Sequence, residues 1–132
     1  MKKSDHDNFD VLNEVNLLQQ DAINFGFNWP NMDMLIEQII SECKEIEQAH
    51  HNNESKDRIQ EEIGDLLHAA MSLCIYNGFD ITETILKNND KFKRRLKALK
   101  IITKNKGLSN LHQQPIELLI NLWKEAKQQH KI

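Results

Sequence analysis

The sequence has few of the residues that interrupt helices or cross-link chains. Its 132 residues include 4 glycines, 2 prolines and 2 cysteines. There is no glycine-rich linker, no repeat and no low-complexity tract, and a chain of this length is about the size of one domain. We therefore expect a single domain over residues 1–132, with residues 1–8 frayed.

The scarcity of cysteine also excludes a disulfide framework. Cys43 and Cys74 both fall inside apolar helical patterns, where a free cysteine behaves as a small hydrophobic residue. The pattern predicts a reducing compartment and no disulfide framework.

Two further features are missing: an excess of basic residues and a long apolar run. The formal net charge is -3, which argues against a general nucleic-acid binder. The opening "MKKSDHDNFD" has lysines but no apolar stretch behind them, and no later segment is long enough to span a bilayer. We expect a soluble, cytoplasmic protein that binds neither nucleic acid nor membrane.

What the sequence does contain is helical periodicity. Glycines and prolines fall where helices should stop or start, Asp80 and Glu83 form a capping-box pattern, and Pro115 suits the first turn of a last helix. No run of alternating β-branched residues indicates a sheet. The prediction is an all-α fold, an antiparallel bundle of about five helices over residues 9–24, 32–50, 56–76, 81–102 and 114–130.

Acidic side chains approach the apolar side of the second predicted helix. With residues spaced about 100° apart around the axis, Glu42 falls on the edge of the apolar stripe and Glu45 lies one step further round on the same side. The stripe itself is formed by Leu35, Ile36, Ile39, Cys43 and Ile46.

The stretch "RIQEEIGDLL" repeats this arrangement on the third predicted helix. Glu62 projects between apolar rows and Asp65 lies beside it, whereas the core side is assigned to Ile59, Ile63, Leu66, Ala70 and Leu73. An isolated ionised carboxylate on an apolar face costs several kcal/mol, so it must be paired, neutralised or bound to a cation. Four carboxylates facing one another predict a divalent cation, and all-oxygen ligation suits Mg²⁺ or Mn²⁺.

A metal held by a few carboxylates is normally shared with phosphates, which predicts a basic partner. In "NNDKFKRRLKAL", Lys91 and Arg95 lie one turn apart on the flank of a core stripe. They either extend along the edge of the core or clamp a phosphate, and four nearby acids favour the clamp.

Together these segments resemble the MazG family of nucleoside triphosphate pyrophosphohydrolases, most closely the catalytic C-terminal domain of its two-domain members. The matching blocks are "GFNWP", "IISECKEIEQA", "RIQEEIGDLLHAAMSLC", "NNDKFKRRLKAL" and "LWKEAKQQ", from about Phe25 to Gln129. The core of the resemblance is the family's Glu-x-x-Glu, spacer, Glu-x-x-Asp pattern, which is matched by Glu42, Glu45, Glu62 and Asp65.

The resemblance implies an all-α fold completed by dimerisation, and Mg²⁺-dependent hydrolysis of a nucleoside triphosphate to a monophosphate and pyrophosphate, a house-cleaning activity on the nucleotide pool. Mn²⁺ is able to substitute, and a dimer of dimers is also open. The four matched acids would be the catalytic metal ligands. Positions that would contact the nucleotide are Glu61, Lys91, Arg95, Trp123 and Lys127. For Trp123 and Lys127 plain core packing is the alternative, and Trp29 is expected only to pack.

The sequence departs from the family pattern near these acids. Ser41 replaces a common Glu, His68 a common Phe, and Ser72 to Ile75 a typical Asn-Leu-Ala-Arg. No matched metal ligand is lost, but base preference and turnover are left open. The alternative function is therefore a catalytically impaired nucleotide-binding module that acts as a sensor or partner protein.

Two other readings compete with this one. A di-iron carboxylate bundle would place Glu-x-x-His on each of two helices, and only Asp65-x-x-His68 comes near that pattern. A phosphoribosyl-ATP hydrolase shares the fold, but "GFNWP" and "LWKEAK" favour the MazG resemblance.

Overall fold

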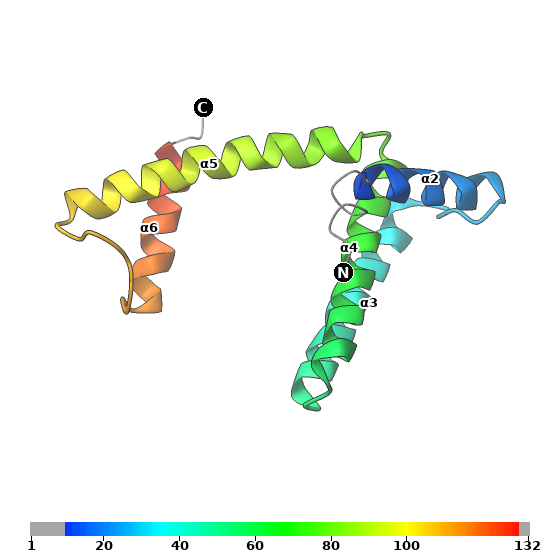
Figure 1. Cartoon of the computed structure of the whole chain (residues 1–132), viewed down its shortest axis with the longest axis horizontal. Coiled ribbons are helices and arrows are strands. Elements are labelled where there is room, and N and C mark those ends of the chain that lie inside the picture. The colour runs from blue at the N-terminus through cyan, green and yellow to red at the C-terminus, as the bar shows by residue number, and fades with distance from the viewer. Residues whose placement is uncertain (1–9, 130–132) are drawn as a thin grey trace. The chain divides into compact units, whose positions relative to one another are not determined.

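The computed structural model describes residues 10–129, and these residues form helices and no strand (Figure 1). The helices are α2 (Val11–Asn24), α3 (Met32–His51), α4 (Lys56–Tyr76), α5 (Ile81–Asn105) and α6 (Ile116–Gln129). The all-α prediction is confirmed for this part of the chain. The expected fraying of residues 1–8 and the predicted helical residue 130 lie outside the described residues. None of the described helices is long and apolar enough to cross a membrane.

Side-chain caps determine where the helices begin. The predicted cap at Asp80 is confirmed, because its Oδ2 accepts a hydrogen bond from the Glu83 N–H at 2.8 Å. Asp10 caps α2 in the same way at 3.0 Å, and α2 begins at Val11. Phe9, the predicted start of this helix, lies outside the described residues. The last helix begins at Ile116, one residue after Pro115.

Left-handed residues end the helices near the predicted stops. Gly26 follows α2 with φ +98°, and Gly78 follows α4 with φ +78°, a region that glycine enters without a steric penalty. At the second stop, the Phe79 N–H returns to the Cys74 carbonyl at 3.0 Å. By contrast, α5 continues past its predicted end at Ile102 as far as Asn105.

The chain divides into two compact units, residues 1–84 and 85–132, and each is described by itself. In the first unit α3 and α4 form a helical hairpin with the most extensive contact between described elements, and α2 packs on α4 (Figure 1). In the second unit α6 packs on the later part of α5 around Ala98, Ile102, Leu122 and Ala126. The expectation of a single domain over residues 1–132 remains a prediction.

The buried side of the hairpin differs from the predicted stripes. On α3 the buried residues are Leu35, Glu42 and Ala49, and on α4 they include Glu62 and Ala69, so burial recurs every seven residues as in a coiled-coil seam. Glu42 and Glu62 therefore sit inside the seam, whereas Asp65 is exposed beside it.

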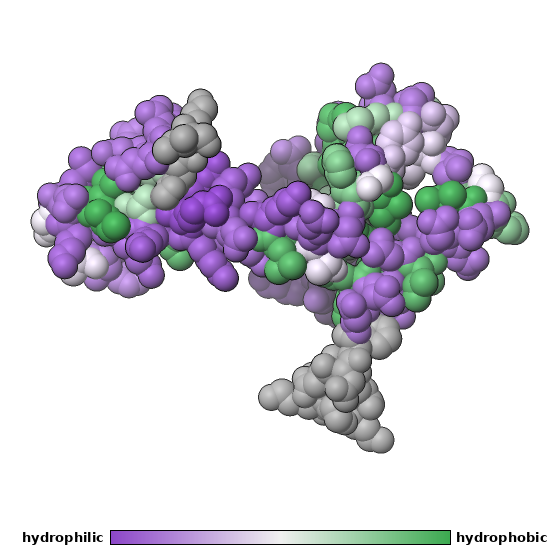
Figure 2. Space-filling model, turned by 90° about the horizontal axis from the view of Figure 1, so that it is seen from above, coloured by the Kyte–Doolittle hydropathy of each residue, from purple (hydrophilic) through white to green (hydrophobic). Residues whose placement is uncertain are grey.

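The apolar side chains displaced by this seam lie on the surface of the chain. Cys43, assigned to the apolar stripe of its helix, is exposed, and Ile63 and Ala70, assigned to the core side, are exposed as well. The physical reason is that helix periodicity identifies an apolar side but not the element that covers it. Figure 2 shows hydrophobic residues reaching the surface among hydrophilic ones.

Candidate metal centre

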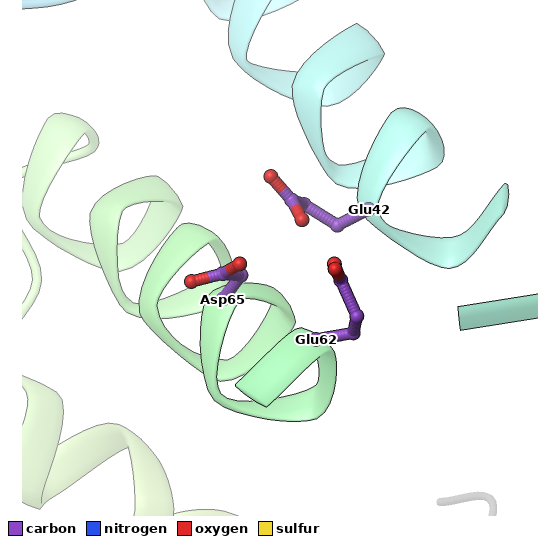
Figure 3. Close-up of side chains that lie close together, drawn as sticks. All are labelled: Glu42, Glu62 and Asp65. Carbon is purple, nitrogen blue, oxygen red and sulfur yellow. The ribbon is translucent and has the colours of Figure 1, made fainter. Parts of the chain in front are cut away.

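Three of the four predicted ligands converge in the seam of the hairpin. Glu42 extends from α3, and Glu62 and Asp65 extend from α4 toward it (Figure 3). One carboxylate oxygen of each residue lies within 4.8 Å of those of the other two. Glu42 is 8% exposed and Glu62 is 3% exposed, whereas Asp65 reaches solvent. The cluster is thus buried on one side and open on the other.

Each buried glutamate has one satisfied and one unsatisfied oxygen. Glu42 Oε1 accepts a hydrogen bond from Gln38 Nε2 at 2.6 Å, and Glu62 Oε1 pairs with Arg58 Nη2 at 2.6 Å. The Oε2 atoms of both glutamates are buried with no hydrogen-bond partner among the described residues. Burying such an oxygen without a partner is unfavourable. Two orphaned carboxylate oxygens beside Asp65 fit a hard divalent cation such as Mg²⁺.

The ionised state of Glu62 is disfavoured in the folded chain. Burial raises the pKa of this carboxyl above its ordinary value, and the neighbouring carboxyls of Glu45 and Asp65 raise it further, while Arg58 lowers it. A cation bound between these carboxyls would remove the repulsion that raises the pKa.

Arg58 is the cation that the described residues already supply. Its guanidinium contacts Glu54 at 3.7 Å, Glu61 at 3.3 Å and Glu62 at 2.6 Å, and about half of its side chain is exposed. Glu61, predicted to contact the nucleotide, is therefore a solvent-exposed residue paired with Arg58.

Glu45, the fourth predicted ligand, is exposed and lies outside the three-residue cluster. It remains close enough for its carboxyl to raise the pKa of Glu62. Its assignment as a ligand stays a prediction.

A cavity of about 290 Å³ adjoins the cluster. Glu42 and Asp65 line it, as do residues of α2, the connector before α3, and α4. Trp29, expected only to pack, is part of its wall, and so are three of the residues that depart from the family pattern, His68, Ser72 and Ile75. The match of the "GFNWP" block to the family pointed to the connector before α3. Helical periodicity could not show that this connector and α4 line the same cavity.

The remaining predicted nucleotide contacts lie in the second unit. Lys91 and Lys127 are exposed, and Arg95 is half-buried with its Nε atom buried and without a partner among the described residues. Trp123 packs against the core of this unit and against Phe92, with ring centroids 5.7 Å apart. Their predicted role beside the acids stays a prediction.

Comparison with known proteins places this hairpin in a defined class. Residues 31–99, just over half of the chain, match the MazG nucleotide pyrophosphohydrolase domain. This stretch contains all of α3 and α4, and with them the three converging carboxylates. The all-α fold is therefore that of a nucleotide pyrophosphohydrolase domain. The chain belongs to the MazG family, and the resemblance found in the sequence is confirmed.

Individual relatives show the same similarity along most of the chain. A nucleoside triphosphate pyrophosphohydrolase/pyrophosphatase MazG of Thermotoga maritima is 31% identical over 89% of this chain and 44% of the relative. A nucleoside triphosphate pyrophosphohydrolase of Escherichia coli K12 is 26% identical over 85% of this chain and 43% of the relative. The chain thus spans less than half the length of these relatives.

Proposed function

We propose that this protein hydrolyses nucleoside triphosphates to nucleoside monophosphates and pyrophosphate, a house-cleaning activity on the nucleotide pool. The observation that carries the proposal is the cluster of Glu42, Glu62 and Asp65, in which two buried carboxylate oxygens have no partner among the described residues. Family membership and the activity for which the two relatives are named support the same reaction.

In this proposal Glu42, Glu62 and Asp65, with Glu45 at the exposed edge, hold Mg²⁺ or Mn²⁺. When bound, the ion supplies Lewis acidity for the phosphate oxygens and for water. Water forms a new bond to the α-phosphorus, the bond from that phosphorus to the bridging oxygen breaks, and pyrophosphate leaves with the bridging oxygen. Glu45 or Glu61, both exposed, accepts the proton that the water loses.

The basic residues complete the proposal. Lys91, Arg95 and Lys127 would neutralise charge on the triphosphate, and Trp123 would contact the nucleotide. The buried Nε atom of Arg95 has no hydrogen-bond partner among the described residues. A phosphate oxygen of the substrate would supply the acceptor that this N–H lacks.

We also propose that the active form is a homodimer. In the described chain, the outer faces of α3 and α4 expose Ile36, Ile40, Ile63 and Leu67, the last with 55% of its surface accessible. Exposed apolar residues repeated at helical spacing on neighbouring helices are typical of a helix-packing surface.

The test of the reaction is pyrophosphate release from a panel of nucleoside triphosphates with Mg²⁺, with Mn²⁺ and with EDTA. We expect metal-dependent release of pyrophosphate and monophosphate by the wild type, and a loss of at least about 100-fold in Asp65→Ala and Glu62→Gln, because both remove charge that holds the cation. Product identity is checked by phosphorus NMR.

Glu47→Gln is the matched control, since Glu47 is an exposed glutamate on α3 outside the cluster. It should keep wild-type activity. Wild-type activity in Glu62→Gln would contradict the site. Tight nucleotide binding without pyrophosphate release would contradict the reaction and identify the protein as a nucleotide-binding module.

A further inference from the structure

The cavity beside the carboxylate cluster is small and is lined mainly by apolar side chains. Its volume of about 290 Å³ is at the lower end of ligand pockets, roughly 300–1,000 Å³. Aromatic and aliphatic side chains, among them Trp29, Ile75 and Tyr76, make up most of its wall. Because Glu42 and Asp65 line the same cavity, a ligand inside it lies next to whatever the carboxylates hold.

The polar groups of the cavity have a defined hydrogen-bonding direction. Ser72 is 8% exposed, and its hydroxyl donates to the His68 carbonyl at 3.0 Å. Gln19 reaches the same carbonyl from α2 with its Nε2 atom at 3.4 Å, which directs the N–H end of that amide to His68. A hydroxyl whose proton is engaged can only accept, so Ser72 presents lone pairs to a ligand.

On the basis of the function proposed above, we propose that this cavity receives the nucleobase and that Ser72 makes it prefer bases that present an amino group. Adenine and cytosine carry an amino group where hypoxanthine and uracil carry a carbonyl. An amino group can donate to the Ser72 Oγ atom, whereas a carbonyl would face it acceptor to acceptor. Such a hydrogen bond changes affinity by about three- to tenfold.

Binding by non-hydrolysable nucleotides tests this inference separately from catalysis. The probes are the α,β-methylene analogues of ATP and ITP, and of CTP and UTP, with Mg²⁺, measured by isothermal titration calorimetry. Mg²⁺–tripolyphosphate is the base-free probe. We expect the amino-bearing member of each pair to bind about three- to tenfold more tightly to the wild type.

For each pair, the affinity ratio is the affinity of the amino-bearing nucleotide divided by that of its carbonyl-bearing partner. Ser72→Ala should reduce both affinity ratios to about one and leave tripolyphosphate affinity unchanged, because the change removes the acceptor but no phosphate contact. The matched control is Thr103→Val. Thr103 is also buried and also donates to its own helix, to the Leu99 carbonyl at 2.7 Å, but it does not line this cavity. Thr103→Val should keep the wild-type ratios.

The cavity itself is tested at Trp29, so that the inference does not rest on Ser72→Ala alone. Trp29→Ala should weaken all four nucleotides by about 5- to 150-fold, the range for loss of one base–aromatic stack, while Trp29→Phe retains most of the affinity. Tripolyphosphate binding should not change in either variant.

Each result has one meaning. A wild-type ratio of one, or an unchanged ratio in Ser72→Ala, overturns the assignment of Ser72. An equal loss of tripolyphosphate and nucleotide binding in Trp29→Ala overturns the base cavity. Base-dependent binding without pyrophosphate release from natural triphosphates would instead sustain this inference and overturn the proposed reaction.

Discussion

At the scale of single residues, Arg58 and Glu62 form a short ion pair within the site. The guanidinium lies 2.6 Å from an oxygen of a carboxylate that is almost wholly buried, and the pKa of Arg58 is raised mainly by Glu62. The same carboxylate is a candidate ligand of the metal. Arg58 therefore stabilises the metal-free chain and competes with the ion for Glu62.

Arg58→Gln should consequently have opposite effects on stability and on metal affinity. We expect a lower melting temperature without Mg²⁺, and a dissociation constant for Mg²⁺ about two- to fivefold smaller, the range that corresponds to one partly exposed charge pair. Calorimetric Mg²⁺ titration in the absence of nucleotide measures the second effect. Lys44→Gln removes an exposed charge from α3 and should change neither quantity. Weaker Mg²⁺ binding in Arg58→Gln would contradict the competition.

At the scale of elements, the sequence predicted the helices better than their packing. The stops near Gly26 and Gly78 and the cap at Asp80 were predictable because each depends on local backbone chemistry. The burial of Glu62 was also predictable, since it lies among apolar rows. The exposure of Ile63 and Ala70 was not predictable, because the angular spacing of residues around a helix shows which side is apolar and not which neighbouring element covers it.

The same reasoning explains why Trp29 was assigned only to packing. Trp29 lines the cavity because α2, α4 and the connector before α3 meet around it. The spacing of residues within one helix does not predict such a tertiary arrangement. By contrast, the convergence of Glu42, Glu62 and Asp65 is predictable because their spacing and the apolar residues around them are both visible along the chain.

The exposed side of α4 leads to a prediction about assembly. Leu67→Lys should convert the proposed dimer to a monomer, with an increase of at least about 100-fold in the dimer dissociation constant, because burying an unpaired charge in a helix interface costs several kcal/mol. Light scattering coupled to size-exclusion chromatography measures the mass. Gln60→Lys adds the same charge at an exposed polar position of α4 and should remain dimeric. A wild type that is monomeric at all concentrations would refute the interface.

At the scale of the whole molecule, metal binding should stabilise the fold. A ligand that binds only the native state at about 100 times its dissociation constant adds about 2.7 kcal/mol to the free energy of unfolding. We therefore expect the melting temperature to rise with Mg²⁺ and to return to its starting value with EDTA. Glu62→Gln should show little of this rise, whereas the control Glu47→Gln should show all of it.

The increase in melting temperature with Mg²⁺ should also depend on pH, and Glu62 determines whether it grows or shrinks as the pH increases. Its pKa is raised in the folded chain, so its contribution to stability is present at low pH and is lost as the pH increases through the raised value. Protons and Mg²⁺ compete for the same carboxylate. The gain from Mg²⁺ should therefore be larger at pH 7.5 than at pH 5, measured by differential scanning fluorimetry, and a larger gain at pH 5 would contradict this assignment.

The α3–α4 hairpin has a further consequence, for the rate of folding. All three converging carboxylates lie between residues 42 and 65, on helices joined only by residues 52–55. Closing so short a connection costs little chain entropy, so these helices meet early, and their negative charges meet with them. Repulsion between the charges then opposes the first steps of folding. A cation that relieves this repulsion in the early hairpin accelerates folding itself, in addition to slowing the unfolding of the finished structure.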